Sequence, residues 1–347
     1  MNIVLITGGP SAEREVSIVS SKSIVKALRE LGHNVRVIDP INGINIAKEE
    51  EIFKSGVRKE SPSLSELSEI HRLSNKNILD CINSDIFDNT DLAFLGVHGK
   101  FGEDGKIQTL LELRGIKYTG SDVFSSALAM DKNISKIILK SAGIKTPEWI
   151  VLNKETYDGD HEKLNKIISE STGYPCVVKP NDEGSTVGLS IVQPDVEDIQ
   201  LGKSLDLAFS YSDKVLIEQY IKGRELTVPV IGREAFPVIE IRPKDGFYDY
   251  EHKYTKGMTE YFCPADIEPD IEEKAKEYAL RAHRILDCSV YSRIDYILDE
   301  NNDLYCLEVN TLPGMTETSL VPKSAAANGM SFNQLIETII KLSLQKK

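Results

Sequence analysis

The chain has 347 residues with 41 Lys or Arg against 54 Asp or Glu, so its net charge at pH 7 is −13. That balance argues against nucleic acid or an anionic membrane surface as a partner, and no run approaches the roughly 20 apolar residues that span a bilayer. The length predicts two or three domains. The apolar N-terminal stretch is too short for a secretion signal, and the five scattered cysteines show no disulfide or metal spacing, so a cytoplasmic protein is expected.

The N-terminal third has the pattern of an α/β domain with a parallel sheet. Residues 3–6 are predicted to form a buried strand, residues 11–31 a helix and residues 34–38 a second strand. This strand–helix–strand order favours parallel pairing. The Gly8-Gly9 turn invites a dinucleotide-binding interpretation, but it lacks the G-x-G-x-x-G spacing. A tight strand-to-helix turn is therefore the default interpretation.

A third strand is predicted over residues 91–97 and ends at the segment His98–Gly105. In an open α/β sheet, ligands meet the loops at the carboxyl ends of the strands. The segments Gly8–Glu13 and His98–Gly105 should therefore lie along one crevice. Residues 40–90 are polar and predict one or two surface helices without chemistry, and the first domain should end near Gly120.

The middle of the chain contains a possible phosphate-binding loop. A helix is predicted over residues 121–142, and a strand over residues 176–180 leads into the loop Glu183–Gly188. Small residues after a strand allow backbone N–H groups to wrap a phosphate, and Lys179 at the mouth of the loop is a useful cation there. A plain surface turn and a solvated lysine are the alternatives. Further strands are predicted at residues 189–192 and 215–220.

The last third alternates strands with one helix, predicted over residues 271–286. A turn is predicted at residues 222–225 and a strand at residues 226–231. The aromatic segment 243–264 has neither a strand nor a helix pattern. Long structureless segments in compact proteins are often active-site lids, so we expect a lid here.

The most informative feature is a pair of segments, Arg293–Asp295 and Glu308–Asn310. The Asn-Asn pair between them suits a two-residue hairpin turn, which places Asp295 opposite Glu308 and Arg293 opposite Asn310. Opposed residues share a face with Cβ atoms roughly 5 Å apart, so two bare carboxylates would repel. A divalent cation removes the conflict, and oxygen ligands suit Mg²⁺ that bridges to phosphates. The pattern predicts a metal–nucleotide enzyme; a solvated edge hairpin is the alternative.

In the order of its motifs the chain resembles the D-alanine–D-alanine ligases of the ATP-grasp superfamily, nearly end to end and least in residues 40–90. The motifs that carry this resemblance are Gly8–Ser17, His98-Gly99 with Gly102–Gly105, Tyr118–Ser121, Met130–Lys132, Val178–Pro180, Glu183–Gly188, Tyr248–Glu251 and Glu308–Thr316. The resemblance implies a three-domain α/β ATP-grasp fold. Residues 1–120 would form a parallel-sheet (Rossmann-like) substrate-binding domain. Residues 121–221 and 222–347 would be the central and C-terminal ATP-grasp domains, which grip ATP.

The implied activity is ATP-dependent joining of two D-alanines through a D-alanyl phosphate, for peptidoglycan precursor synthesis. Two Mg²⁺ ions, replaceable by Mn²⁺, and a cytoplasmic homodimer are also implied. Relatives join D-alanine to D-lactate or D-serine, although the pair Lys253-Tyr254 resembles the D-alanine dipeptide makers. The alternatives from other classes are a non-catalytic ATP-binding regulator and a dehydrogenase that uses the Gly-Gly turn.

The resemblance also implies roles for individual residues. The implied nucleotide contacts are Lys132, Lys179 and Lys253 at the phosphates, Glu183 and Ser185 in the loop, and Glu218, Tyr220, Ile221 and Glu225 at adenine and ribose. The implied Mg²⁺ ligands are Asp295, Glu308 and Asn310. The implied substrate contacts are Glu13 and His98 for the first D-alanine, Ser319 and Leu320 for the second carboxylate, and Arg293 with the Gly314 N–H for the oxyanion. Ser185, Tyr254 and Glu13 would form a hydrogen-bonded trio.

Overall fold

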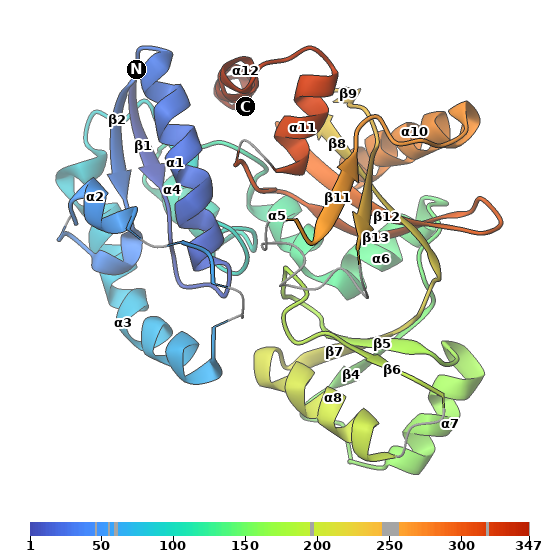
Figure 1. Ribbon diagram of the computed structural model, residues 1–347. Coiled ribbons are helices and arrows are strands. Elements are labelled where there is room, and N and C mark those ends of the chain that lie inside the picture. Colours follow the sequence, from blue (N-terminus) through green and yellow to red (C-terminus); the bar gives the residue numbers. More distant parts are fainter. Residues whose placement is uncertain are drawn as a thin grey trace.

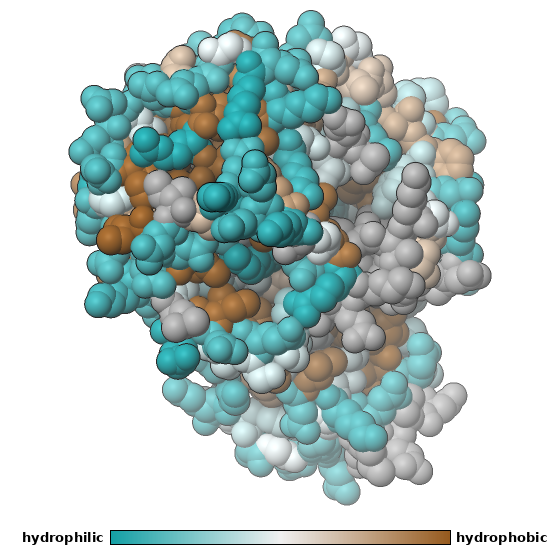
Figure 2. Space-filling view, turned by 60° about the vertical axis from the view of Figure 1, so that its left-hand side comes forward, coloured by the Kyte–Doolittle hydropathy of each residue, from teal (hydrophilic) through white to brown (hydrophobic). Residues whose placement is uncertain are grey.

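The computed structural model describes residues 1–45, 47–54, 56–58, 62–194, 198–244, 257–316 and 319–346. Three sheets with helices packed against them make up the molecule (Figure 1). On the face seen in Figure 2 hydrophilic residues predominate, and apolar residues form small patches between them. Within the described ranges no helix combines the length and the apolar composition needed to cross a bilayer.

The N-terminal sheet is parallel, as predicted. It contains β1 (Asn2–Ile6), β2 (Asn34–Ile38) and β3 (Leu92–Leu95) in the order β2-β1-β3. The associated helices are α1 (Arg14–Glu30), α2 (Glu49–Ile52), α3 (Leu64–Asn83) and α4 (Lys106–Leu113), with 3-10 turns at Pro40–Asn42 and Asp85–Phe87. Helices on both sides of a parallel sheet bury both faces of its strands, which explains the continuous apolar runs of β1 and β3.

The central sheet is antiparallel and has one apolar and one polar face. Its strands β4 (Trp149–Asn153), β5 (Cys176–Pro180), β6 (Ser190–Val192) and β7 (Lys214–Gln219) have the order β4-β7-β5-β6. Val215 and Ile217 lie in a core together with α7 (His161–Ser171) and α8 (Asp198–Tyr211). Because side chains alternate along a strand, Glu218 points to the opposite face.

The C-terminal sheet carries the acidic hairpin. Its strands are β8 (Gly223–Ile231), β9 (Glu234–Ala235), β10 (Ile239–Pro243), β11 (Thr259–Phe262), β12 (Tyr291–Asp299) and β13 (Leu304–Asn310), in the order β11-β10-β8-β12-β13 with β9 beside β8. One face packs against α5 (Val123–Met130), α6 (Lys132–Ser141) and α10 (Pro269–Ile285). The opposite face carries the acidic side chains of the hairpin. The chain ends with α11 (Leu320–Ala327) and α12 (Phe332–Gln345).

Outside the acidic hairpin, three sequence-based predictions of local structure were wrong. The helix predicted over residues 121–142 is broken at Asp131, whose extended backbone ends α5 and whose side chain accepts the N–H of Ile134 to start α6. The turn predicted at residues 222–225 is instead the beginning of β8. In the segment 243–264, residues 259–262 form β11, which pairs with β10. Residues 245–256, including Lys253 and Tyr254, lie outside the described residues.

The hydrophobic cores join parts of the chain that are far apart in sequence. The core of the N-terminal sheet includes Val321 and Ala325 of α11 and Leu335 and Ile339 of α12. Figure 1 shows α12 at the junction between the N-terminal sheet and the rest of the molecule. The end of the chain therefore helps to fix the N-terminal sheet beside the C-terminal one. The boundaries proposed at residues 120 and 221 stay a prediction.

Candidate active site

The register predicted for the acidic hairpin is confirmed. Arg293 pairs with Asn310, and Asp295 pairs with Glu308. The predicted two-residue turn is wrong, because Asp299 bonds to Asp303 and leaves residues 300–302 in the loop. The Asp299 side chain accepts two N–H groups of this loop at 2.8 and 2.9 Å, which stabilises the longer turn.

A β-bulge restores the register that the longer turn would have shifted. The pairing slips between Asp295 and Tyr296, so Leu307 is an extra residue on β13. Leu304 and Cys306 lie in the core, and plain alternation would send Glu308 to that same face. The extra residue turns Glu308 and Asn310 to the face of Asp295. The bulge therefore creates the acidic cluster.

The carboxylates of the hairpin are paired with cations. Arg293 donates from Nε and Nη2 to the two oxygens of Asp295, at 2.9 and 2.7 Å. Asn310 Nδ2 donates to Asp295 Oδ2 at 3.0 Å, and the Thr227 hydroxyl, which the sequence analysis did not single out, donates to Oδ1 at 2.5 Å. Lys132 Nζ lies 3.4 Å from Glu308 Oε2. These partners already compensate the negative charge of the two carboxylates, a role that the sequence analysis gave to a metal ion.

The donor set nevertheless fits a magnesium ion. Asp295, Glu308 and Asn310 offer two carboxylates and an amide oxygen at one place on the sheet. Throughout the described ranges, no three His, Cys, Asp or Glu side chains are gathered as a metal site. Mg²⁺ is commonly held by one or two carboxylates, with substrate phosphates and water as its other ligands. Two acidic side chains at the edge of a cavity suit that mode of binding.

A cavity of about 590 Å³ lies against this face of the C-terminal sheet and brings most of the predicted site together. The predicted residues that line it are Glu13, His98, Ser185, Glu225, Arg293, Asp295, Glu308, Asn310, Gly314, Ser319 and Leu320. They come from the N-terminal loops, the loop after β5, the C-terminal sheet, and the segment that leads from β13 into α11. Lys132 and Glu183 line a small adjoining cavity that Glu13, Glu308 and Asn310 share.

Glu13 is held closely between two loops. Ser185 donates its hydroxyl to Glu13 Oε1. A Cβ atom on Gly184 would lie 2.6 Å from Glu13 Oε2, and one on Gly99 would lie 2.5 Å from it. Only glycine permits this approach at both positions. Two members of the predicted trio are thus in contact, and the third, Tyr254, lies outside the described residues.

The loop after β3 supplies two buried titratable groups. His98 Nδ1 lies 2.8 Å from the carbonyl oxygen of Leu312, and burial lowers the pKa of His98 against the opposing effect of Glu13. Glu103 accepts the N–H groups of Gly99 and Leu312 at 2.8 and 3.4 Å. Burial raises the pKa of Glu103 to about 8, and nearby Glu13 acts in the same direction.

Glu103 belongs to the motif Gly102–Gly105, but the sequence analysis did not predict it to be a site residue. Its place at the carboxyl end of β3, where ligands of α/β sheets gather, was the available signal. Its two backbone bonds join the N-terminal loop to the loop after β13, so it helps to hold the two sides of the cavity together.

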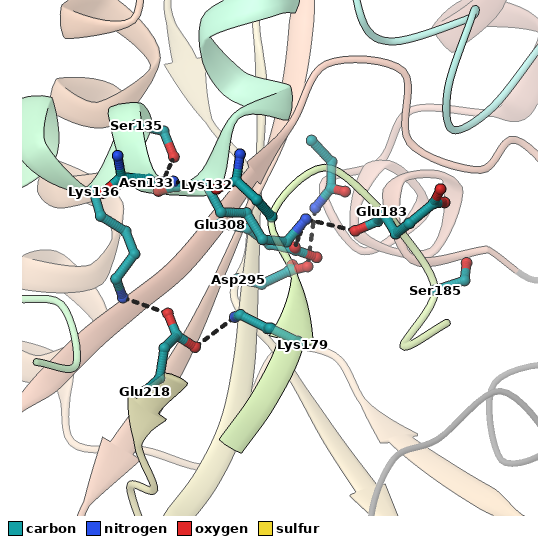
Figure 3. A network of polar contacts seen from close by, with 12 residues as sticks. Lys132, Asn133, Ser135, Lys136, Lys179, Glu183, Ser185, Glu218, Asp295 and Glu308 are labelled. Carbon is teal, nitrogen blue, oxygen red and sulfur yellow. Dashed lines mark hydrogen bonds and ion pairs between the residues drawn. The ribbon is translucent and has the colours of Figure 1, made fainter. Parts of the chain in front are cut away.

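The polar face of the central sheet carries a buried network of three charged groups (Figure 3). Glu218 lies between two lysines, with Lys179 Nζ 2.5 Å from Oε2 and Lys136 Nζ 2.7 Å from Oε1. Burial alone would raise the pKa of Glu218, but the two lysines lower it to about 2. Lys136 was missed in the sequence, although it lies one helical turn beyond Lys132 on α6 and so shares its face.

The remaining predicted nucleotide residues surround this network. Glu183 is paired with Lys100 of the N-terminal loop at 2.8 Å, and burial raises the pKa of Glu183 to about 7 although Lys100 opposes the shift. Lys132 donates to the Glu183 carbonyl oxygen at 2.6 Å. Tyr220 and Ile221 follow β7, half-buried, and do not line the large cavity.

Comparison with known families identifies both halves of the chain. The family model described as "D-ala D-ala ligase N-terminus" matches residues 2–121, and "D-ala D-ala ligase C-terminus" matches residues 138–341. A D-alanine–D-alanine ligase of Halalkalibacterium halodurans is 40% identical over all of both chains. A relative of the same name from Aquifex aeolicus is 39% identical over 98% of this chain and 100% of its own.

Solved structures agree with the sequence comparison. A D-alanine–D-alanine ligase from Bacillus anthracis, complexed with ATP, has a TM-score of 0.74 and 33% identity, covering 99% of this chain and 98% of its own. The VanG D-Ala:D-Ser ligase of Enterococcus faecalis has a TM-score of 0.77 and 28% identity, covering 99% of both. The fold is that of an ATP-grasp ligase, which confirms the predicted fold class. The chain belongs to the D-alanine–D-alanine ligase family and is a ligase.

Proposed function

We propose that this ligase joins two D-alanines to D-alanyl-D-alanine, with cleavage of ATP to ADP and phosphate, for peptidoglycan precursor synthesis. The observation that carries the proposal is the single cavity in which Glu13, Arg293 and the acidic pair Asp295 and Glu308 meet. An anion for an ammonium group, a cation for a carboxylate or oxyanion, and ligands for a metal are the groups this reaction needs. The names of the relatives support the choice of D-alanine.

In the first step the carboxylate of one D-alanine attacks the γ-phosphorus of ATP, which breaks the bond to the bridging oxygen, releases ADP and forms D-alanyl phosphate. A free carboxylate does not acylate an amine at neutral pH because its leaving group is poor, and phosphorylation supplies a good one. Glu13 would bind the ammonium of this D-alanine, next to buried His98. Ser185 fixes the carboxylate of Glu13 by its hydrogen bond.

The nucleotide would lie between the polar faces of the central and C-terminal sheets. Lys132, Lys179 and the loop Glu183–Gly188 would contact the phosphates, where their charge and N–H groups stabilise the transferring group. Residues of β7, its end and β8 would contact adenine and ribose: Glu218, Tyr220, Ile221 and Glu225. Lys253 at the transferring phosphate and Tyr254 in the trio stay predictions of the sequence.

Asp295, Glu308 and Asn310 would hold the Mg²⁺ ions, for which Mn²⁺ can substitute. Bound there, the metal supplies positive charge to the phosphate oxygens. Arg293 and Lys132, which pair with Asp295 and Glu308, hold these carboxylates in place.

In the second step the amine of the other D-alanine attacks the acyl phosphate. A C–N bond forms and phosphate leaves through a tetrahedral intermediate that carries an oxyanion. Arg293 and the Gly314 N–H would stabilise that charge. Ser319 and Leu320, which line the same cavity, would hold the carboxylate of the second D-alanine.

A second candidate acceptor is D-serine. The observation in its favour is the similarity to the D-Ala:D-Ser ligase VanG, whose TM-score of 0.77 is slightly above the 0.74 of the Bacillus anthracis enzyme. The identities favour D-alanine, since the VanG chain is 28% identical against 40% for the Halalkalibacterium relative. D-Lactate is a third acceptor within the family.

The test is product identification by mass spectrometry. The protein is incubated with ATP, Mg²⁺ and D-alanine, alone and with equal D-serine or D-lactate, and a matched sample receives EDTA. D-Alanyl-D-alanine should be the main product and should disappear with EDTA. A dominant mixed product would replace the proposed acceptor, and ADP formation without any dipeptide or depsipeptide would refute the proposed reaction.

We also propose a cytoplasmic homodimer. The supporting observations are the family and the five free cysteines, since unpaired thiols suit a reducing compartment. Light scattering coupled to gel filtration measures the mass in solution, and a mass equal to one chain would contradict the dimer.

A further inference from the structure

Lys136 is a buried cation without a role in the proposed reaction. Its side chain is fully buried on α6. Its ammonium nitrogen donates to Thr146 Oγ1 at 2.6 Å, lies 2.7 Å from Glu218 Oε1 and is 5.0 Å from the centre of the Trp149 ring. Burial lowers the pKa of Lys136 in spite of the opposing effect of Glu218.

Packing alone does not explain a lysine at this position. Burial of an ammonium group is unfavourable before any partner is counted, and a methionine has a similar shape without this desolvation penalty. What a methionine lacks is a charge to place on Glu218. The charge of Lys136 therefore acts on the charge and orientation of the Glu218 carboxylate.

The two oxygens of Glu218 have different partners, and these partners differ in freedom (Figure 3). Oε1 is held by Lys136, which has no exposed side-chain surface, whereas Oε2 is held by Lys179, whose side chain is 11% exposed. Lys179 lies on β5, just before the loop Glu183–Gly188 that is proposed to bind the phosphates. When it turns toward a triphosphate, Oε2 loses its partner and Lys136 alone keeps Glu218 ionised and oriented.

A fixed carboxylate oxygen is a selective acceptor. Adenine carries an exocyclic amino group that donates a hydrogen bond to such an oxygen. Guanine presents a carbonyl oxygen at the equivalent ring position, and two acceptors that face each other in a buried site repel. A carboxyl group that picked up a proton or rotated would distinguish the two bases less well.

We propose that Lys136 is a positioning residue that fixes Glu218 as an ionised acceptor and thereby selects adenine over guanine nucleotides. The inference rests on the proposed function, because it takes the face that carries Glu218 as the nucleobase site. It goes beyond that function in assigning base selection to a lysine that does not reach the ligand.

The chain provides a matched control on the same helix. Lys140 lies one turn beyond Lys136, and its nitrogen is 5.5 Å from the centre of the same Trp149 ring. It pairs with Glu148 at the surface and keeps 53% of its side chain exposed. Lys140→Met therefore changes the charge of α6 and the contact with Trp149 without touching Glu218.

The experiment measures Kd for ADP and GDP by calorimetry, and kcat/KM for ATP and GTP, on the wild type, Lys136→Met, Lys136→Gln and Lys140→Met. Both Lys136 variants should lower the adenine-to-guanine preference at least about tenfold, while KM for D-alanine stays within about twofold. Lys140→Met should leave the preference unchanged. Lys136→Gln can keep the bond to Thr146, so one folded variant is expected, and thermal melts check this.

Three outcomes overturn the inference: an unchanged preference in the Lys136 variants, the same loss in Lys140→Met, or a uniform loss of affinity for both nucleotides. A uniform loss is what a purely structural role would give. The calorimetric values do not need turnover, so an inactive wild type would refute the proposed function and leave this test valid.

A double-mutant cycle tests the route of the effect. If Lys136 acts through Glu218, Glu218→Gln combined with Lys136→Met should lose no more base preference than Glu218→Gln alone. Additive losses would show that Lys136 acts on the nucleotide by another path, and would overturn the assignment to Glu218.

Discussion

Two regions of the candidate site carry opposite excesses of charge. On the C-terminal sheet and the N-terminal loops, the carboxyl groups that line the large cavity, such as Glu13, Asp295 and Glu308, outnumber cations such as Arg293. On the central sheet and helix α6 beside it the order is reversed, since Lys136 of α6 and Lys179 of β5 share one carboxylate, Glu218. We call these the acidic side and the basic side.

The excess charge on each side is opposite in sign to the charge of the ligands that the proposed reaction places there. Metal ions and the ammonium of D-alanine are positive and suit the acidic side, whereas a triphosphate is negative and suits the basic side. Buried charges are stable only with partners. The protein therefore compensates part of each charge with its own residues, and the bound ligands would compensate the rest.

The largest expected effect comes from Arg293 on the acidic side. Arg293→Ala should lower kcat by roughly 10²–10³-fold, the usual loss for one oxyanion donor, while Kd for ATP changes little. Asp295 keeps Thr227 and Asn310 as partners, so the fold should persist. Steady-state kinetics and calorimetry measure the two quantities. Retained turnover would contradict the role of Arg293, and lost ATP binding would show that the two sides do not act separately.

A smaller effect is expected on the basic side from Lys179→Met. Charge-assisted hydrogen bonds contribute roughly 1.5–3 kcal/mol, so KM for ATP should rise roughly 10–100-fold with little change in KM for D-alanine. Lys136 still compensates Glu218 in this variant, which protects the fold. Lys163→Met is a control, because Lys163 is an exposed lysine on α7. Equal changes in both KM values would speak against a separate basic side.

The smallest expected effect concerns Glu103 and the pH dependence of stability. Its pKa is raised from 4.5 to about 8, so the folded state keeps a proton that the unfolded state loses. The free energy of unfolding should therefore fall as pH rises from 4.5 toward 8. Glu103→Gln has no such proton, and its stability relative to the wild type should increase over this range.

One pKa unit corresponds to about 1.4 kcal/mol, so at least about this change is expected for Glu103→Gln between the two ends of the range. Denaturant unfolding at pH 5 and pH 8 measures this change in stability. Glu112→Gln, on helix α4, is the control variant. A constant difference across pH would show that Glu103 is already ionised in the folded protein.

Much of this arrangement could be predicted from the sequence. Apolar runs and turn residues located β2 and β5 with the correct bounds and β1 to within one residue, because local propensity and alternation determine strands. The order of the motifs indicated the family, and counting residues around an assumed two-residue turn gave the correct pairing of Asp295 with Glu308 although the turn itself was wrong. These are properties of neighbouring residues or of a short hairpin.

The rest depended on contacts between distant segments. The turn of the hairpin has one residue more than predicted, and only the bulge at Leu307 returns Glu308 to the face of Asp295. Lys136 meets Glu218 across 82 positions of sequence because α6 packs beside the central sheet. Glu103 reaches the N–H of Leu312 from another sheet. Sequence alone determined which residues carry charge and which strands they occupy; tertiary packing decided which charges meet, because burial and partners arise only when the layers come together.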